Sequence, residues 1–260
     1  MCQSPKVRIW LAAPYLTERW IAECLDAAEL GVFEGLRSSQ AKASYLRAHV
    51  LLRSALTDFL PGTAPGAWRF ARTGTGRPVV AGLSNPPSFS LSRAPRLVGC
   101  SVAAGVPHGL DVVDLDRKVE AVERIALSRE ERWQLADLTP AAKRERLAAL
   151  WALKEAYVKA RGLGLTLPVE RVSFRFGADG IEATFGAAIH DDPMRWWFGV
   201  WKPTAESVLA LAVERVGGRV PGFTWHRMPY GNLTRESISS PSPHPPLLAS
   251  TPPWASVASP

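Results

Sequence analysis

Three charged side chains lie within an otherwise apolar segment, WALKEAYVKA, at residues 151–160. At about 100° per residue in a helix, Lys154 falls inside the apolar arc, while Glu155 and Lys159 lie side by side at its edge. One interpretation is a surface ion pair between Glu155 and Lys159, which contributes about 0.2–0.5 kcal/mol. The other is a cleft in which the lysines hold an anion and the carboxylate holds a metal ion. Lys154 favours the second, because a lysine within an apolar arc must snorkel, be paired or face an anionic ligand.

Strong start and stop signals predict the helix that carries these charges. Thr139 and Pro140 are typical of an N-cap and a first turn, and Gly162 is typical of a helix terminator. Lys159 and Arg161 fall in the last turn, where the helix dipole favours cations. The residues that share the apolar arc are Leu147, Leu150, Trp151, Tyr157 and Val158.

A second source of carboxylates is the segment GLDVVDLDR, residues 109–117. Asp111 follows a glycine in a short apolar strand, where a buried acid is costly unless it has a partner. Asp114 and Asp116 are interpreted as loop acids or as a cap for the next helix. Asp111 and Glu155 together could provide the carboxylate pair of a magnesium site, which water and a substrate phosphate would complete.

The elements that position these residues occur in the same order in two halves, residues 1–108 and 109–220. Each half begins with a strand, continues with helical segments and ends with antiparallel strands. This order predicts an α+β fold, a pseudo-two-fold dimer of two similar subdomains with a ligand-binding cleft between them. The predicted segments of the first half are VRIWLAA, QAKASYLRAHVLLRSALTDFL, PSFSLS and RLVGCSVAAG. Those of the second half are GLDVV, helices at about 121–138 and 140–161, then RVSFRF, IEATFG, RWWFGVW and SVLALAVERV.

Residues 221–260 differ in composition from the rest of the chain. Seven of the 22 prolines lie in the last twenty residues, where serine is also frequent. Such a segment buries too little apolar surface to offset the entropy lost on ordering, so we predict a disordered C-terminal tail.

Composition restricts the class of protein. The cysteines Cys2, Cys24 and Cys100 have no close spacing, so neither a disulfide framework nor a thiolate zinc site is expected. No apolar run is long enough for a membrane span, and we expect a cytoplasmic monomer without a membrane partner. The formal charge of +7 favours anionic partners, but the basic residues are dispersed, which argues against nucleic acid.

GLDVV, followed about forty residues later by WALKEAYVKARGLGL, resembles the Sfp-type 4′-phosphopantetheinyl transferases. The signature of that family is a Gly-hydrophobic-Asp-hydrophobic-Glu strand followed by Trp-x-x-Lys-Glu-Ser/Ala-x-x-Lys. GLGLTLPVERVSF is similar to the family's Gly-x-Gly-Leu-x-Leu-Pro run. In the first half the resemblance extends to SFSLSRAPRLVGCSV, TGTGRPVV and RAHVLLRSAL, so that it covers nearly all of residues 1–216.

The resemblance implies transfer of the phosphopantetheine arm of coenzyme A to a serine of an acidic apo carrier protein, with adenosine 3′,5′-bisphosphate as by-product. It implies coenzyme A and Mg²⁺ in the cleft, with Asp111 and Glu155 as metal ligands. Glu155 would also be the catalytic base, and Lys159 would act both in catalysis and in coenzyme A binding. Further implied coenzyme A contacts are Arg53, Arg77, Ser92, Arg93 and Lys154.

Two positions depart from the family pattern. The family's second strand acid is Val113 here, so water would fill the vacant ligand position unless a bulge turns Asp114 inward. Arg93 stands where histidine is common, and a permanently charged guanidinium suits a 3′-phosphate. Val113 motivates an alternative function, a non-catalytic protein that binds coenzyme A or a carrier protein. A Mg²⁺-dependent phosphohydrolase that uses the same acids is a more distant alternative.

Overall fold

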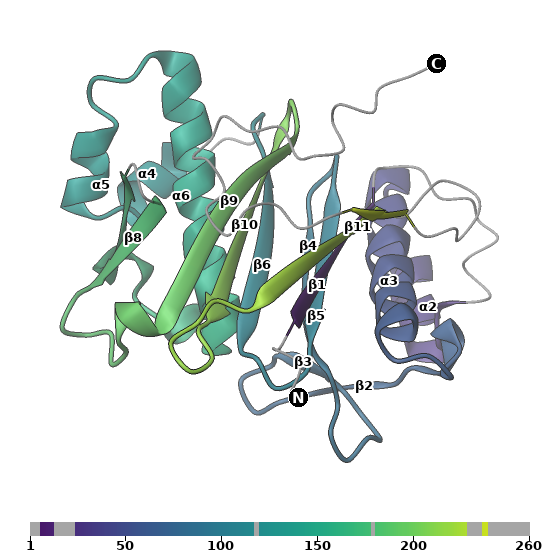
Figure 1. Ribbon diagram of the computed structural model, residues 1–260. Coiled ribbons are helices and arrows are strands. Elements are labelled where there is room, and N and C mark those ends of the chain that lie inside the picture. The colour runs from purple at the N-terminus through teal and green to yellow at the C-terminus, as the bar shows by residue number, and fades with distance from the viewer. Residues whose placement is uncertain (1–5, 13–23, 117–119, 178–179, 228–235, 239–260) are drawn as a thin grey trace.

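Two β-sheets form the centre of the structure, and one long helix packs against each of them (Figure 1). This computed structural model describes residues 6–12, 24–116, 120–177, 180–227 and 236–238. Within the predicted tail, residues 228–235 and 239–260 lie outside the described residues. Cys2 also lies outside them. Among the described residues, no helix combines the length and the apolar character that crossing a bilayer requires.

The first half supplies most of the five-stranded sheet, whose strand order is β12-β11-β1-β5-β4. Its strands and helices are β1 (Lys6–Ala12), α2 (Ala27–Gly35), α3 (Ser39–Phe59), β4 (Ser88–Arg93) and β5 (Val98–Ala103). A small hairpin, β2 (Phe70–Arg72) and β3 (Pro78–Val80), precedes β4. Helix α3 and the β4–β5 hairpin confirm the predictions for these segments.

The second half contains the three-stranded sheet β6-β10-β9 and a separate β7–β8 hairpin. Its elements are β6 (His108–Asp114), α4 (Glu120–Ile125), α5 (Arg129–Gln134), α6 (Pro140–Arg161), β7 (Val172–Gly177), β8 (Gly180–Phe185), β9 (Trp196–Thr204) and β10 (Ser207–Glu214). The helix predicted near 121–138 is two short helices, because Ser128 caps a new helix with Glu131 at its third position.

Both halves share one strand order. In each, the first strand is followed by helices and pairs antiparallel with the last strand, which lies in the middle of the set: β1-β5-β4 and β6-β10-β9. This agreement supports the prediction of an α+β fold with two similar halves. That a pseudo-two-fold rotation relates them stays a prediction.

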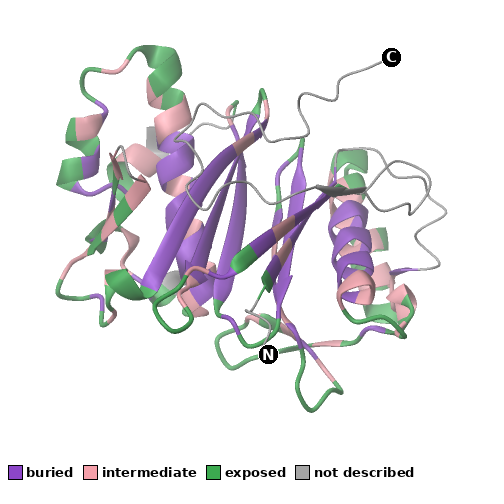
Figure 2. Cartoon of the chain, viewed as in Figure 1, coloured by how far each residue is buried: buried purple, intermediate pink, exposed green. Residues whose placement is uncertain are grey.

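Three large apolar layers hold the sheets and long helices together, and a small fourth cluster joins α2 to α3. Alternation along the strands separates the large layers. On β10, Val208 packs toward α6, whereas Leu209 faces the core that the two sheets share. Strand β1 divides in the same way, with Ile9 in the shared core and Trp10 in the layer under α3. Figure 2 shows the result: the central strands and the inner faces of α3 and α6 are buried, and α5 is largely exposed.

The folded part of the chain extends beyond the predicted start of the tail at residue 221. Strand β11 (Gly222–Arg227) pairs parallel with β1, and Phe223 and Trp225 are buried in the shared core. Strand β12 (Glu236–Ile238) pairs with β11. The predicted boundary is therefore wrong for residues 222–227, because apolar side chains there find a sheet edge far away in the sequence.

Candidate active site

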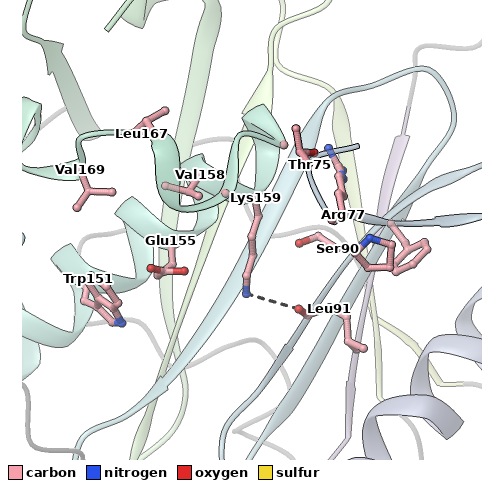
Figure 3. A pocket seen from close by; sticks show the side chains of 15 residues that line it. Thr75, Arg77, Ser90, Leu91, Trp151, Glu155, Val158, Lys159, Leu167 and Val169 are labelled. Carbon is pink, nitrogen blue, oxygen red and sulfur yellow. Dashed lines mark hydrogen bonds between the residues drawn. The ribbon is translucent and has the colours of Figure 1, made fainter. Parts of the chain in front are cut away.

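A cavity of about 500 Å³ opens between the first half and helix α6 (Figure 3). The turn between β2 and β3 and strand β4 form one side, and α6 and the segment after it form the other. The residues around it are Thr75, Gly76, Arg77, Pro78, Phe89, Ser90, Leu91, Trp151, Glu155, Val158, Lys159, Gly162, Gly164, Leu167 and Val169. The sequence predicted a ligand site in a cleft between the halves, and this cavity has contributions from both.

Helix α6 presents Trp151, Glu155 and Lys159 to the cavity, one turn apart from each other (Figure 3). The predicted ends of this helix are confirmed: the Thr139 hydroxyl accepts a hydrogen bond from the Ala142 amide, and Gly162 ends the helix with a φ of 66°. The opposite face of α6 is buried against the β6-β10-β9 sheet. Packing therefore fixes the helix, and its edge supplies polar groups to the cavity.

Gly109 brings α6 into contact with β6. A Cβ atom at this position would lie 2.0 Å from the carbonyl oxygen of Ala156 and 2.5 Å from the amide nitrogen of Ala160. No side chain fits in that space, so the glycine before Asp111 permits the close approach of the two elements. The approach places Asp111, two residues further along the strand, next to Lys159.

Asp111 lies under the charged edge of α6, where two donors share one of its oxygens. The ammonium of Lys159 and the hydroxyl of Ser92 each donate to Asp111 Oδ1 at 2.6 Å. The same ammonium donates to the carbonyl oxygens of Leu110 at 3.1 Å and Leu91 at 3.5 Å. Lys159 thus joins the predicted metal ligand Asp111 to the cavity.

Serine side chains on β4 join the two sheets at this point. The Leu110 amide donates to Ser90 Oγ at 2.9 Å, and the Val112 amide donates to Ser92 Oγ at 3.1 Å. The hydroxyls thereby satisfy amides of β6 that face another sheet. Ser92 is buried, so its hydroxyl holds β6 and Asp111 in position rather than pointing into open space.

Arg77 reaches the cavity from the turn between β2 and β3. Burial lowers the pKa of its guanidinium, although arginine stays charged at any physiological pH. A Cβ atom at Gly162 would lie 3.2 Å from Arg77 Nη1, so the guanidinium packs against the C-terminal end of α6. Arg93, another predicted coenzyme A contact, is exposed at the end of β4 and is not among the residues that line the cavity.

Lys154 does not contact the cavity, against the prediction. Its side chain is fully buried and forms a 2.8 Å ion pair with Glu131, which is equally buried. It also donates to the carbonyl oxygens of Val169, at 2.9 Å, and Val172. Burial lowers the pKa of the ammonium, and Glu131 opposes that shift. The lysine fits an apolar arc because it has an internal partner on α5, which helical periodicity does not reveal.

Arg53, another predicted coenzyme A contact, is likewise internal and is not among the residues that line the cavity. Its guanidinium, completely buried, donates to Glu29 at 2.6 Å and to the carbonyl oxygens of Trp68 and Pro65 at 2.8 and 3.0 Å. The arginine therefore ties α3 to α2 and to the chain before β2. Trp196 and Trp197 are both buried in apolar layers.

The two strand positions after Asp111 are used for structure. Val113 faces α6 on the same side of β6 as Asp111 and packs in the apolar layer there. Asp114 faces the other way and accepts hydrogen bonds from the Ser207 hydroxyl at 2.6 Å and the Arg96 amide at 3.0 Å. Strand β6 keeps regular pairing with β10 through these residues, so no bulge turns Asp114 toward Asp111.

The oxygen atoms around the Lys159 ammonium are of the type that Mg²⁺ binds. They are carboxylate and carbonyl oxygens, and they already surround one cation, the ammonium of Lys159. Glu155 lies one turn before Lys159 on α6 and also lines the cavity. In the described part of the chain, no three or more His, Cys, Asp or Glu residues converge on a possible metal position. A magnesium site here would thus have Asp111 and Glu155 as its protein carboxylates.

The sequence did not reveal the apolar wall of the cavity. Trp151 was interpreted only as a packing residue of the helix, but it lines the cavity next to Glu155. Leu167 and Val169 come from the segment after α6, which the Lys154 side chain holds through the Val169 carbonyl. The glycines of GLGL provided a signal, because Gly162 and Gly164 adopt φ values of 66° and 59° and turn the chain around the cavity.

Residues 107–212, which contain β6, α6 and the sheet of the second half, match the ACPS family, the 4′-phosphopantetheinyl transferase superfamily. A holo-[acyl-carrier-protein] synthase of Geobacillus kaustophilus is 30% identical over 45% of this chain and 95% of its own length. A 4′-phosphopantetheinyl transferase of Bacillus subtilis is 27% identical over 46% of this chain, and the match spans only 52% of that protein. A crystal structure of the Bacillus anthracis holo-(acyl-carrier-protein) synthase in complex with CoA (3′,5′-ADP) aligns with 42% of this chain and 94% of its own chain, at 21% identity and a TM-score of 0.34.

The match includes the strand that carries Asp111 and the helix that carries Glu155 and Lys159. The Geobacillus relative is covered almost completely at 30% identity, which is sufficient to assign the family. The chain therefore belongs to the 4′-phosphopantetheinyl transferase superfamily.

Proposed function

We propose that this protein transfers the 4′-phosphopantetheine arm of coenzyme A to a serine of an apo carrier protein, as an Sfp-type enzyme. One observation carries the proposal: Arg77, Glu155 and Lys159 line a single cavity, and Lys159 connects it to Asp111. The contribution of the first half to the cavity supports the Sfp type. Less than half of the chain corresponds to nearly the whole Geobacillus synthase, and the other half supplies one wall of the cavity.

In the proposed reaction, the serine oxygen attacks the phosphorus atom that carries the pantetheine arm. A new P–O bond forms to the serine, and the P–O bond to the bridging oxygen of the pyrophosphate breaks. Adenosine 3′,5′-bisphosphate leaves with the electron pair, and the serine proton passes to the carboxylate of Glu155, directly or through water. Such a transfer depends on placing the nucleophile in line and on neutralising the phosphate charge.

The side chains of the cavity suit these tasks. Arg77 and Lys159 bring positive charge from opposite walls, so a pyrophosphate between them would be neutralised from both sides. Glu155 lies between Lys159 and Trp151 on the same face of α6, where it can receive a proton from a nucleophile that enters the cavity. Asp111 and Glu155 would hold Mg²⁺, which, when bound, adds charge neutralisation at the pyrophosphate.

The remaining lining of the cavity is largely apolar. Trp151, Val158, Leu167 and Val169 form a wall from α6 and the segment that follows it. A flexible pantetheine arm has methyl and methylene groups that such a wall can cover, while its amides need few polar partners. We assign this wall to the pantetheine arm and the Arg77 side to the nucleotide end of coenzyme A.

A second cavity, of about 670 Å³, supports an acidic protein partner. It lies between α5 and the β7–β8 hairpin, and its lining has more basic than acidic residues: Arg124, Arg129, Arg132, Arg171 and Arg175 against Glu130 and Glu170. Ile125 and Trp133 in the same region are 69% and 72% exposed. Positive charge beside exposed apolar side chains is suited to an acidic protein surface. Together with the net charge of +7, this surface favours an acidic carrier protein.

Exchanging Arg129 for Glu tests this surface. We expect a raised KM for the carrier protein and an unchanged KM for coenzyme A, because charge repulsion would act on the protein partner alone. Arg69→Glu, on the opposite half of the molecule, is a control. Equal carrier kinetics of the two variants would contradict the assignment of this surface.

Mass measurement of an intact carrier tests the proposed function. The protein is incubated with coenzyme A, Mg²⁺ and several acidic apo carriers, and we expect the mass of one phosphopantetheine to appear on the carrier serine. Adenosine 3′,5′-bisphosphate should appear in equal amount. Binding of coenzyme A without any mass gain would favour the non-catalytic alternative. If the protein neither binds coenzyme A nor increases the mass of any carrier, the proposal is overturned.

A cytoplasmic monomer remains the expectation from the sequence.

A further inference from the structure

The ammonium of Lys159 is held in a nest of oxygen atoms. It donates to Asp111 Oδ1 at 2.6 Å, to Leu110 O at 3.1 Å and to Leu91 O at 3.5 Å. A lysine has three N–H donors, so these acceptors use all of them. The dashed contact to Leu91 in Figure 3 shows the ammonium directed toward β4. In this arrangement Lys159 cannot also donate to a ligand.

The same side chain borders the cavity, and 29% of it is accessible to solvent, whereas only 9% of the Asp111 side chain is. The lysine stem can therefore rotate into the cavity, while Ser92 keeps Asp111 in place. Movement of the ammonium would leave a carboxylate and two carbonyl oxygens without their cation. Such a cluster of hard oxygens is a preferred environment for a small divalent cation.

We propose that Lys159 is an exchangeable counter-ion of Asp111. In the ligand-free protein its ammonium occupies the cation position and excludes a divalent metal. When an anionic ligand enters the cavity, the ammonium transfers to it, and the metal takes the vacated position. Metal and ligand therefore bind with positive cooperativity. The identity of the ligand as coenzyme A rests on the proposed function, but the competition between ammonium and metal does not.

Charge counting supports this order of events. The proposal assigns two carboxylates to the metal, Asp111, which pairs with Lys159, and Glu155, which lies one turn before Lys159 on α6, and the described residues form no larger acidic or histidine cluster. Lys159 neutralises the carboxylate of Asp111. A divalent cation alone would have to displace an ammonium at 2.6 Å, which makes the bare site a poor one. Phosphate oxygens both attract the lysine and supply further metal ligands, which favours joint binding.

Binding of Mn²⁺ to the purified full-length protein, followed by the electron paramagnetic resonance signal of free Mn²⁺, tests the proposal. Lys159→Met should bind Mn²⁺ about tenfold more tightly than the unaltered protein when no coenzyme A is present. Lys143→Met removes a charge from the same helix, where Lys143 pairs with Glu123, and should bind Mn²⁺ as the unaltered protein does. Adding Asp111→Asn to Lys159→Met should abolish the gain.

Coenzyme A provides the second arm of the experiment. In the unaltered protein it should tighten Mn²⁺ binding about tenfold, and Mn²⁺ should tighten coenzyme A binding by the same factor. In Lys159→Met this coupling should be weaker, because only the metal ligands that the phosphate oxygens supply would still link the two binding events. Lys159→Gln, which removes the charge but keeps an amide donor for the carbonyl oxygens, replaces the methionine variant if the latter does not fold.

The two arms separate the two claims. Equal Mn²⁺ affinity of the unaltered protein and a folded Lys159 variant would overturn the exchange of counter-ions, whatever the enzymatic activity. Failure of the unaltered protein to bind coenzyme A would instead contradict the proposed function. In that case a tighter Mn²⁺ site in Lys159→Met would still support competition at Asp111.

Discussion

A buried ion pair supports the wall of the cavity from behind. Lys154 and Glu131 join α6 to α5, and Lys154 also holds the carbonyl groups of Val169 and Val172. Glu131 accepts further hydrogen bonds from the amides of Ser128, at 2.9 Å, and Phe174, at 3.0 Å. This network fixes the position of Val169, which lines the cavity. Lys154 therefore supports the wall of the cavity and does not line it, although it is next to Glu155 in the sequence.

Replacing Lys154 by Met should lower the free energy of unfolding by about 3–5 kcal/mol, because Glu131 would remain buried without its charged partner. In the fraction that folds, the KM for coenzyme A should change by less than about threefold, since Lys154 does not line the cavity. Urea unfolding and steady-state kinetics measure the two effects.

The double variant Lys154→Met/Glu131→Leu is the control for this pair, and we expect it to be more stable than Lys154→Met alone. A stable Lys154→Met protein with a greatly raised KM would show instead that the lysine contacts the substrate.

Glu29 provides the clearest dependence of stability on pH. Burial would raise the pKa of its carboxyl, but hydrogen bonds from His49, from the Asp26 amide and from Arg53 outweigh burial and lower the pKa from 4.5 to about 2. The charged form is thus favoured in the folded state. Its contribution to stability is complete above about pH 4.5 and is lost as the pH falls toward 2.

Glu29→Gln should lower the free energy of unfolding by about 2 kcal/mol at pH 7, because hydrogen bonds to a charged group are lost. The difference from the unaltered protein should shrink between pH 4.5 and pH 2. Denaturant unfolding at several pH values measures it. Glu34→Gln, exposed on the same helix, serves as control. A difference that stays constant down to pH 2 would contradict the assigned role.

The contact between α6 and β6 determines whether Lys159 meets Asp111. Gly109 allows this contact, because an added Cβ would overlap the backbone of α6 at Ala156. Both elements are closely packed into the layer that contains Val113. A larger residue at 109 must push the helix that carries Glu155 and Lys159 away from Asp111.

Gly109→Ala should therefore lower the free energy of unfolding by about 3 kcal/mol or more and also reduce transfer in the folded fraction. Thermal unfolding and carrier mass measurement report on the two effects. Gly31→Ala is the matched control: a Cβ at Gly31 meets nothing within 4 Å, and alanine suits its helix. Equal stability of the two variants would contradict the close approach at Gly109.

Local signals predicted the elements well. The Thr139-Pro140 start and the Gly162 end of α6 are properties of a few neighbouring residues, and the structure confirms them. The placement of Lys154 and Arg53 could not be predicted in this way. Their partners, Glu131 and Glu29, lie on other helices, and sequence periodicity does not show which helices meet.

At the scale of the whole molecule, β11 lies between β1 and β12 in the five-stranded sheet and packs on the core that both halves share. Its pairing with β1 brings residues 222–227 next to residues 6–11. Proline-rich composition nearby suggested a tail, but Phe223 and Trp225 are buried. Composition describes a segment on average, whereas a strand needs only a few apolar residues and an unpaired sheet edge.

A chain that ends at residue 220 should be less stable than the full chain by at least about 4 kcal/mol, because the contacts of two large aromatic side chains are lost. A chain that ends at residue 240 keeps β12 and should unfold at the same temperature as the full chain. Trp225→Ala in the full chain separates core packing from chain length and should cost about 3–5 kcal/mol. Calorimetric unfolding of the two shortened chains, Trp225→Ala and the full chain measures these effects. If all of them are equally stable, β11 does not contribute to the fold.

The cavity itself depends on both halves, since Arg77 comes from the first and Glu155 from the second. The sequence predicted these two residues for the site through short motifs, and the structure brings them to one cavity. Of the proposed roles, acceptance of the serine proton by Glu155 depends most strongly on this arrangement.

The rate of phosphopantetheine transfer by the Glu155→Gln variant is the most direct test of this role. With coenzyme A, Mg²⁺ and an apo carrier, we expect the rate of phosphopantetheine mass gain to fall at least about 10²-fold, while the fold and coenzyme A binding persist. Glu145→Gln, on the same helix where Glu145 pairs with Lys202, should keep the rate of the unaltered protein. A folded Glu155→Gln protein that modifies its carrier at a near-normal rate would contradict the proposed role of the cavity.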